Sequence, residues 1–475
     1  MKSIKSISIF GRISHACLFL LAAGGALVSA QAAPGASDAS QPAAGMVFRN
    51  VDLIAHPVKT VPSSCFWIGA VTPKENNILY PDAGATYWVS QFRVPPGARL
   101  RLRGEYPHAR YISFTSYNSQ GNATDSVNDL GIQPEPGSVN PFVPGNDRTS
   151  PKRRYVVDVL DELAPDRAEL RKANTLYARS DEPMVQLYYR VYVPDQGKDV
   201  AGGVRLPEPE LVQADGTVVS GSDLCNQLVV PEGTLRDRTL PRDRYLAVIE
   251  RPGVPSTFPA LAPPQWEAVQ NPPLLLTRLT LAGTPEGDQQ RLKMDQSRRG
   301  GFYPSLENRY MMMYIDRRLG PVLTLKGKLP TTPATRSGAR TVPATQLRYW
   351  SLCDYRSLVD SAVGQCLTDE DVVSDAKREY TIVVSRKEDR PSNARPECGA
   401  TWLEWDDAGD GVKNKDGGFL MVRNMLPAAD FKQSIHDVGT IADAEKVMGP
   451  YYPSPVYSTK EVFESKGCQA TSERP

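Results

Sequence analysis

The sequence contains few histidines and none of the short motifs that mark common enzyme classes. No Gly-x-Ser-x-Gly elbow, His-Glu-x-x-His motif, phosphate-binding glycine-rich loop or Cys-x-x-Cys pair occurs in it. Only His56, His108 and His436 follow the N-terminal segment, and they are too far apart in the sequence to predict a zinc site. We therefore expect no cofactor and assign no metal ligand. A Ser-His-Asp triad that uses His108 or His436, or a carboxylate pair such as Glu404 with Asp406, stays open because such sites assemble from distant segments.

The chain also lacks an excess of charge and, after its N-terminal segment, any long apolar run. Its formal net charge is +1. Lys2, Lys5 and Arg12 precede an apolar run over residues 16–28, and Ala30-Gln31-Ala32 provides a small-residue cleavage site. This pattern predicts a secretory signal peptide over residues 1–32, whose removal changes the net charge to −2. We expect a secreted or periplasmic protein with no integral membrane segment after signal cleavage and no nucleic-acid partner.

One of the seven cysteines lies inside the apolar run, which leaves six in the predicted mature chain. An even number of cysteines in an oxidising compartment favours up to three disulfides, with free buried thiols as the alternative. Only the pair Cys353 and Cys366 is favoured by its short separation, and closing a loop of that length contributes roughly 3 kcal/mol. The sequence selects no pairing for the rest, which are Cys65, Cys225, Cys398 and Cys468.

A block near position 80 recurs near position 300 without a gap. The two copies are offset by 223 residues and share eight positions: Tyr80-Pro81, Tyr87, Gly97, Leu100, Leu102, Gly104 and Pro107 match Tyr303-Pro304, Tyr310, Gly320, Leu323, Leu325, Gly327 and Pro330. Such a long ungapped repeat predicts that one fold is encoded twice.

Three further blocks repeat in the same order. Arg110-Tyr111-x-Ser113-x-x-x-Tyr117 recurs as Arg348-Tyr349-x-Ser351-x-x-x-Tyr355 at an offset of 238. The extra residues form a Pro/Thr/Ser/Arg-rich insertion over 331–345, which predicts an exposed loop. The other repeats pair Arg154-Tyr155-Val156-Val157 with Glu379-Tyr380-Thr381-Ile382, and Leu187-x-x-Arg190-x-x-x-Pro194 with Leu420-x-x-Arg423-x-x-x-Pro427.

Glycine and proline are frequent, at 36 and 41 residues, and they separate short runs in which apolar and polar residues alternate. This spacing favours strands and turns, for example strands over 97–104 and 185–193 and a hairpin turn over 213–217. Helix-like spacing occurs only over 158–173 and 241–250. We predict an all-β protein with two tandem, internally duplicated antiparallel β-sandwich domains, jelly-roll-like, and few short helices. The predicted boundaries are a flexible tail over 33–45, domain 1 over 46–221, a Pro-rich connector packed on the domains over 222–299, and domain 2 over 300–466.

The repeated Arg-Tyr strand carries the strongest candidate for a binding surface. Period-two alternation places its tyrosines and serine on one face and apolar residues on the other. Flat rings with hydroxyl groups suit sugars or aromatic ligands, although a structural sheet face is the simpler alternative. Arg190 and Arg423 occupy matching strand positions and could clamp an anion or satisfy backbone carbonyls. The predicted ligand-binding residues are Tyr111, Ser113, Tyr117, Arg190, Tyr349, Ser351, Tyr355 and Arg423.

Two loops contain several oxygen-bearing side chains. Residues 118–129 could converge on a ligand or on calcium, with a polar hairpin tip as the alternative. Residues 405–411 resemble a calcium loop superficially, but Ala408 stands where an oxygen ligand is needed and Gly417 where a bidentate glutamate belongs. We therefore expect no calcium site in the second loop.

The second half resembles bacterial β-sandwich proteins of the domain-of-unknown-function families numbered 1214 and 1254. The resemblance rests on Arg348-Tyr349-Trp350-Ser351-Leu352, on the segment Thr401-Trp402-Leu403, and on the Leu-x-x-Arg-x-x-x-Pro strand, over about 120 residues. The sequence departs from the family pattern at Glu404 and at Asn424-Met425, whereas residues 190–194 match it more closely. The resemblance implies jelly-roll-like sandwiches and implies no established activity, so it assigns no catalytic residue.

Our leading hypothesis is an exported protein that binds a small or polymeric ligand, carbohydrate or aromatic. The site would lie on the Tyr/Ser strand faces or in the cleft between the domains. A metal-independent hydrolase or lyase acting outside the cytoplasm is the alternative, and a structural envelope protein is a further one.

Overall fold

A computed structural model describes residues 54–57, 65–118, 121–179, 184–228, 234–237, 240–269 and 303–468. All of them belong to one compact unit, Asn50–Pro475. The predicted signal peptide and tail lie outside the described residues. We call residues 65–228 the first half and residues 268–468 the second half.

The first half forms two five-stranded sheets. One sheet has the order β2-β3-β9-β5-β6, with bounds Gly69–Val71, Ala85–Phe92, Val185–Pro194, Ala109–Tyr117 and Ala123–Asn128. The other has the order β11-β10-β4-β7-β8, with bounds Val218–Val219, Glu208–Val212, Arg99–Glu105, Arg154–Leu160 and Thr175–Tyr177. Within these sheets every pairing is antiparallel except that of β7 with β8.

The second half repeats this arrangement. Its first sheet has the order β13-β14-β20-β16-β17, with bounds Ala268–Val269, Asn308–Asp316, Gly417–Pro427, Leu347–Tyr355 and Val363–Thr368. Its second sheet has the order β19-β18-β15-β21, with bounds Ala400–Glu404, Glu379–Ser385, Val322–Lys328 and Ser454–Ser458. Here too a single pairing, β18 with β19, is parallel.

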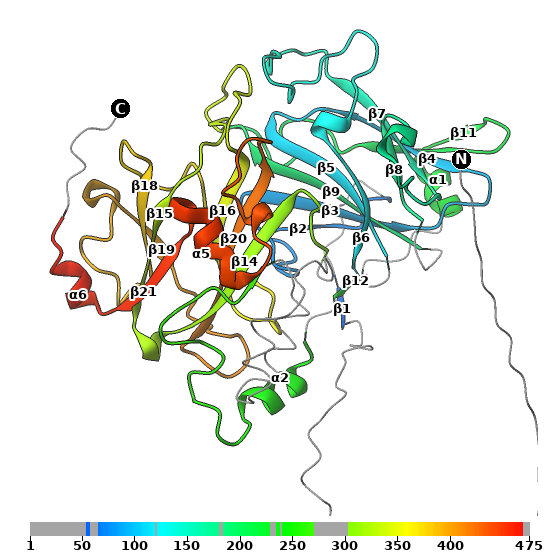
Figure 1. Ribbon diagram of the computed structural model, residues 1–475. Helices are drawn as coiled ribbons and strands as arrows, with labels where there is room; N and C mark the ends of the chain where they lie inside the picture. The colour runs from blue at the N-terminus through cyan, green and yellow to red at the C-terminus, as the bar shows by residue number, and fades with distance from the viewer. Residues whose placement is uncertain are drawn as a thin grey trace, which may run out of the picture. The chain divides into compact units, whose positions relative to one another are not determined.

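The strand orders confirm the internal duplication. Strands β3, β9, β5 and β6 correspond in order and position to β14, β20, β16 and β17, and β4, β7 and β8 correspond to β15, β18 and β19. Figure 1 shows β3, β9 and β5 side by side in one half, and β14, β20 and β16 side by side in the other. The parallel end pair is reproduced as well, so the correspondence extends over both sheets, and β11 has no counterpart among the described strands of the second half.

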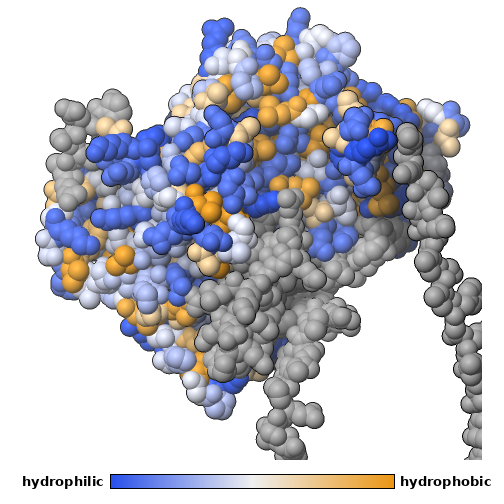
Figure 2. Space-filling model, in the orientation of Figure 1, coloured by the Kyte–Doolittle hydropathy of each residue, from blue (hydrophilic) through white to orange (hydrophobic). Residues whose placement is uncertain are grey.

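Each half has its own apolar core between its two sheets, as alternation along the strands predicted. Leu100 and Leu102 of β4 and Ile112 and Phe114 of β5 contribute to the core of the first half. In the second half the matching positions of β15 and β16 lie in a separate core. On the face that Figure 2 shows, hydrophilic residues cover most of the described surface and apolar residues are scattered between them. The fold is therefore all-β with two sandwich-like halves.

Helices are short. Within the described residues the α-helices are α1 Gly221–Leu228, α2 Arg242–Ile249, α5 Ala444–Met448 and α6 Lys460–Glu464. Single 3₁₀ turns span Asp129–Gly131, Ala168–Leu170, Arg317–Leu319, Pro396–Cys398, Ile435–Asp437, Ile441–Asp443 and Gly449–Tyr451. The helix expected over 241–250 is confirmed by α2, whereas the one expected over 158–173 is wrong: β7 continues to Leu160, Pro165 excludes a helix that runs through it, and a single 3₁₀ turn, Ala168–Leu170, follows.

The connector and the insertion pack on the halves. Leu224 and Leu228 of α1 join the first core, whereas Trp266 and Val269 join the second core. A short ladder pairs β1, Ile54–Pro57, with β12, Thr234–Asp237. The insertion 331–345 has no helix or strand, as expected, but it is not simply an exposed loop, because Thr335 is fully buried and accepts a hydrogen bond from Arg110.

All six cysteines of the predicted mature chain are paired. The predicted disulfide Cys353–Cys366 joins β16 to β17, and the other two disulfides are Cys65–Cys225 and Cys398–Cys468. Among the described residues, no helix has the length and apolarity needed to cross a membrane.

Candidate functional site

The eight predicted ligand-binding side chains lie at the contact between the two halves. Each is at most 3% exposed. Tyr111 and Tyr192 of the first half form one apolar cluster with Tyr349 and Met425 of the second half. The face of each Arg-Tyr strand opposite the core is therefore covered by the other half of the molecule.

The first half holds a turn of the second half through two side chains. The Tyr117 hydroxyl donates to the backbone carbonyls of Tyr303 and Pro304, at 3.2 and 3.0 Å. Nη2 of Arg190 donates to the Tyr303 carbonyl at 3.0 Å and also contacts the Tyr117 hydroxyl. The repeated Tyr-Pro pair is therefore a docking segment for the opposite half.

The second half holds the matching turn of the first half in the same way. The Tyr355 hydroxyl donates to the carbonyls of Tyr80 and Pro81, at 3.3 and 3.0 Å. Nη2 of Arg423 donates to the Tyr80 carbonyl at 3.0 Å. The exchange is thus reciprocal, and Tyr80 and Tyr303 share a left-handed backbone, with φ of 55° and 52°. Non-glycine residues adopt this conformation only where the surroundings hold them in it.

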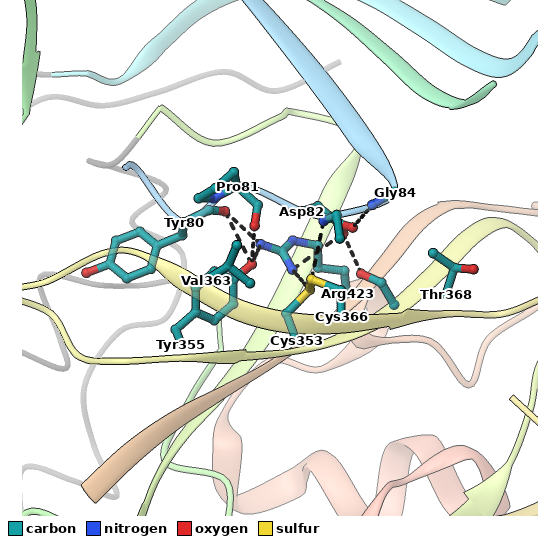
Figure 3. The surroundings of a disulfide bond; sticks show 12 residues. Tyr80, Pro81, Asp82, Gly84, Cys353, Tyr355, Val363, Cys366, Thr368 and Arg423 are labelled. Atoms are coloured by element: carbon teal, nitrogen blue, oxygen red, sulfur yellow. Dashed lines mark hydrogen bonds and ion pairs between the residues drawn. A yellow bond between two sulfur atoms is a disulfide. The ribbon is translucent and has the colours of Figure 1, made fainter. Parts of the chain in front are cut away.

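An acid of the first half completes the site of the second half. Asp82 Oδ1 accepts a hydrogen bond from the Tyr349 hydroxyl at 2.7 Å, and Oδ2 accepts one from the Ser351 hydroxyl at 2.6 Å. Nη1 of Arg423 lies 3.5 Å from Asp82 Oδ2. Figure 3 shows the guanidinium of Arg423 between Asp82 and Tyr355. This buried carboxylate is paired and hydrogen-bonded, as burial of a charge requires.

The predicted disulfide lies beside this ion pair. Figure 3 shows Cys353 and Cys366 next to Arg423, whose Nη1 is 3.2 Å from Cys353 Sγ. These two sulfur atoms and an oxygen of Asp82 lie within 4.8 Å of one another, but a disulfide leaves no thiolate to bind a metal. In the first half the same positions hold Thr115 and Ser126, whose hydroxyls are 3.2 Å apart.

The site of the first half has no matching acid. Ser305 follows Tyr303-Pro304 at the position that Asp82 takes after Tyr80-Pro81. Among the described residues, Arg190 has no ion-pair partner, and its Nε and Nη1 atoms have no hydrogen-bond partner. The hydroxyls of Tyr111 and Ser113 also lack a hydrogen bond of normal geometry to any described residue. Buried polar groups in this state are uncommon.

A cavity of about 70 Å³ lies between the two sites. Both arginines line it, together with apolar and aromatic residues of both halves. The remaining lining residues are Val71, Leu79, Tyr80, Pro81, Tyr87, Tyr188, Tyr192, Tyr303, Pro304, Ser305, Tyr310, Met312, Leu358 and Met421. We call it the tyrosine cavity.

Tyrosine rings surround the charges of the cavity. The Arg190 guanidinium lies 5.4–5.6 Å from the ring centres of Tyr87, Tyr117 and Tyr188. Such contacts attract a cation but do not neutralise it. Burial, followed by the nearby Asp82, raises the pKa of Tyr87 to about 12. Its hydroxyl therefore stays protonated at neutral pH and can donate a hydrogen bond.

The other repeated arginines also cross between the halves. Nη1 of Arg110 lies 2.7 Å from both carboxylate oxygens of Asp369, and Arg348 Nη1 lies 3.4 Å from Asp129 Oδ2. Burial is the main cause that raises the pKa of Asp129 to about 6, against the opposing effect of Arg348. The repeat of Arg-Tyr in the sequence therefore reflects two reciprocal ion pairs.

The residues of the hydrolase alternative contact other groups in the structure. The His108 ring contacts Arg153, and Nε2 of His436 lies 3.0 Å from the backbone carbonyl of Asn424. Glu404 pairs with Lys387, and Asp406 with Arg356. Neither histidine lines the tyrosine cavity.

The two candidate loops use their oxygens for internal contacts. In the first loop, Asp125 pairs with Arg171 at 2.7 Å, and Asp129 belongs to the ion pair with Arg348. In the second loop, Oδ1 of Asp410 accepts hydrogen bonds from three backbone amides, those of residues 412–414. These contacts favour polar turns at both places.

Sequence reasoning missed Asp82 and Ser305. The repeated Tyr-Pro pair indicated this turn. The residue directly after the pair is Asp82 in one copy and Ser305 in the other, so comparison of the two copies did not single it out. Asp129 and Asp369 directly follow β6 and β17. They were missed as partners of the repeated arginines because the residues around them differ between the two copies.

No family model and no curated protein matches the chain. Two solved structures are similar over most of its length. An uncharacterized protein from Burkholderia cenocepacia covers 77% of this chain and 80% of its own length, with 13% identity and a TM-score of 0.40. A protein from Vibrio parahaemolyticus covers 80% and 90%, with 11% identity and a TM-score of 0.34. Similarities of this size carry no argument about function, and the resemblance to the two domain-of-unknown-function families stays a prediction.

Proposed function

We propose that the chain is an exported protein that binds a small molecule in the tyrosine cavity between its halves. The observation that carries the proposal is the convergence of buried tyrosines and two arginines on a cavity that both halves line. Concave, largely apolar sites with a few buried polar groups are the usual form of small-ligand sites. Export is supported by the signal-like N-terminus and by three disulfides.

The size of the cavity favours a compact ligand over a polymer. Its volume is about 70 Å³, whereas an engineered apolar cavity that admits benzene measures about 150 Å³. The tyrosines of the Arg-Tyr strands are buried, so a glycan chain could reach them only if the halves separated. A molecule smaller than benzene is therefore a better candidate than a glycan chain.

The test is a variant that fills the cavity. Met421 lines it, and the matching position in β9 is Tyr188, so the strand accepts a tyrosine at this register. The native exported protein would be analysed by mass spectrometry for a copurifying compound and screened against small molecules by thermal shift. We expect Met421→Tyr to abolish the binding found, and Val456→Tyr, which adds the same ring at an exposed site, to preserve it.

A purely structural envelope role predicts a different result. The native protein would then carry no compound, no small molecule would raise its melting temperature, and Met421→Tyr would change nothing except stability. That combination would overturn the proposal.

A further inference from the structure

The internal duplication provides a direct comparison between two copies of one polar site. In the copy that belongs to the second half, Tyr349, Ser351 and Arg423 converge on the carboxylate of Asp82. In the other copy their counterparts are Tyr111, Ser113 and Arg190, on strands of the same order and register. Three groups that bind a carboxylate in one copy are thus retained in the other, where Ser305 has no carboxylate to offer.

The retained groups have unused capacity. Arg190 is 1% exposed, and its Nε and Nη1 atoms have no hydrogen-bond partner among the described residues. The buried hydroxyls of Tyr111 and Ser113 likewise lack a hydrogen bond of normal geometry within the described part of the chain. A buried guanidinium without an anionic partner is unfavourable, and an anion that enters the site would satisfy it.

The cavity reaches this copy of the site and can admit a ligand. Arg190 and Ser305 both line the cavity, whereas Asp82 does not. Ser305, the counterpart of Asp82, therefore borders the cavity with a neutral side chain where the other copy has a carboxylate. The surrounding rings of Tyr87, Tyr188 and Tyr310 give the rest of the cavity an apolar, aromatic lining.

We infer that the Arg190 side of the tyrosine cavity binds the carboxylate of a small organic acid, in the place that Asp82 takes in the other copy. The inference rests on the proposed function and names its ligand class. The carboxylate accepts hydrogen bonds from Arg190 and from the hydroxyl of Ser305, which both line the cavity, while the apolar body of the acid packs among the tyrosine rings.

Glu307 is the competing partner and has to be tested. It accepts hydrogen bonds from Ser126 at 2.8 Å and from Ser305 at 2.9 Å, and its charge acts on Tyr111. It forms no ion pair with Arg190. If Glu307 were the true counter-ion of Arg190, Glu307→Gln would weaken the fold and leave acid binding absent. In our inference Glu307→Gln removes a like charge and strengthens acid binding.

The first measurement needs no variant. Acids and their neutral amides of the same shape, from acetate and acetamide to butyrate and butyramide, would be titrated into the full chain with intact disulfides. A charge-assisted hydrogen bond adds enough for the acid to bind about tenfold more tightly than its amide. Equal affinity of acid and amide would overturn the inference and leave the proposed function standing.

The second measurement exchanges the two copies. Ser305→Asp combined with Glu307→Gly grafts the Asp82-x-Gly84 pattern onto the first site. We expect the grafted carboxylate to occupy the site, to raise the melting temperature, and to remove the preference for acids over amides. Retention of the full preference in a folded graft would contradict the inference.

The reverse exchange, Asp82→Ser, opens the other copy. We expect this variant to be less stable than the natural chain and to regain part of the loss in acetate but not in an equal concentration of acetamide. Absence of rescue in a folded Asp82→Ser variant would count against the carboxylate assignment. Failure of every ligand in all variants, together with no effect of Met421→Tyr, would instead overturn the proposed function itself.

Discussion

Arg110 and Asp369 come from different halves and form a fully buried ion pair with both carboxylate oxygens 2.7 Å from Arg110 Nη1. Arg348 and Asp129 make the matching contact in the opposite direction at 3.4 Å. Together with the exchanged Tyr-Pro turns, these pairs show that the repeated motifs of the sequence mark the surface between the halves.

Removal of Arg110 will leave Asp369 buried without its cation. We expect Arg110→Met to lower the free energy of unfolding by about 3–5 kcal/mol, the range for one broken partner of a buried pair. Denaturant unfolding measures this loss. The control is Arg103→Met, because Arg103 pairs with Glu210 at a surface where its side chain is 45% exposed, and we expect a loss of less than about 1 kcal/mol. Equal losses in the two variants would contradict the argument.

Position 84 requires a glycine because the Tyr349 side chain lies close to its backbone. A Cβ atom at this position would overlap the Tyr349 hydroxyl, which donates to Asp82. We expect Gly84→Ala to displace that ring and to lower the free energy of unfolding by about 1–3 kcal/mol. Gly439→Ala is the matched control, because nothing lies within 4 Å of a Cβ atom there. If both variants unfold at the same denaturant concentration, the close contact between Gly84 and Tyr349 does not contribute to stability.

The disulfide Cys353–Cys366 can be replaced by the solution that the other half uses. Its counterparts Thr115 and Ser126 hold the same two strands with a hydrogen bond of 3.2 Å. We expect the double variant Cys353→Thr, Cys366→Ser to fold. Loss of the disulfide lowers its free energy of unfolding by roughly 3 kcal/mol, and the new hydrogen bond offsets part of that loss. Thermal unfolding under non-reducing conditions measures the loss, and reducing agent should then have a smaller effect on the variant than on the natural chain.

His108 will make the fold more sensitive to acid. Burial, followed by the charges of Arg153, Lys198 and Arg148, lowers its pKa to about 4 from the usual 6.5. Between these pH values the unfolded chain binds a proton that the folded chain does not, so stability falls as pH decreases from 6.5 to 4 and is unaffected by this group above 6.5. We expect His108→Gln to lose less stability than the natural chain between pH 7.5 and 4.5. An identical loss in both proteins would show that His108 does not contribute.

The architecture was predictable from the sequence because the duplication repeats the same pattern of strand and turn residues in both halves. The leucines at positions 100 and 102 and the ungapped Tyr-Pro to Gly block are local signals that recur in the second copy, although the arginines between the leucines do not. The partners of the repeated residues were not predictable in the same way. Asp82 and Asp369 act across the halves, and a contact between segments 250 residues or more apart leaves no periodicity in the sequence.

The helix wrongly expected over 158–173 shows a further limit of sequence patterns. Charged and apolar residues have helical spacing there, but Val157 and Val159 are buried as part of β7, and Leu163 and Leu170 are exposed at 70% and 54%. Burial by tertiary contacts decided the structure of this segment, and spacing alone could not reveal it.

The reciprocal exchange of Tyr-Pro turns has a consequence for how such a chain could arise. Each half presents a receptor for a turn that only the opposite half supplies, so a single isolated half would leave its arginine and tyrosine without that turn. Two identical ancestral subunits could close the same contacts around a twofold axis, since each would both give and receive the turn. Within one chain the two receptors no longer have to be equal, and here one receives a turn that carries an aspartate and the other a turn that carries a serine.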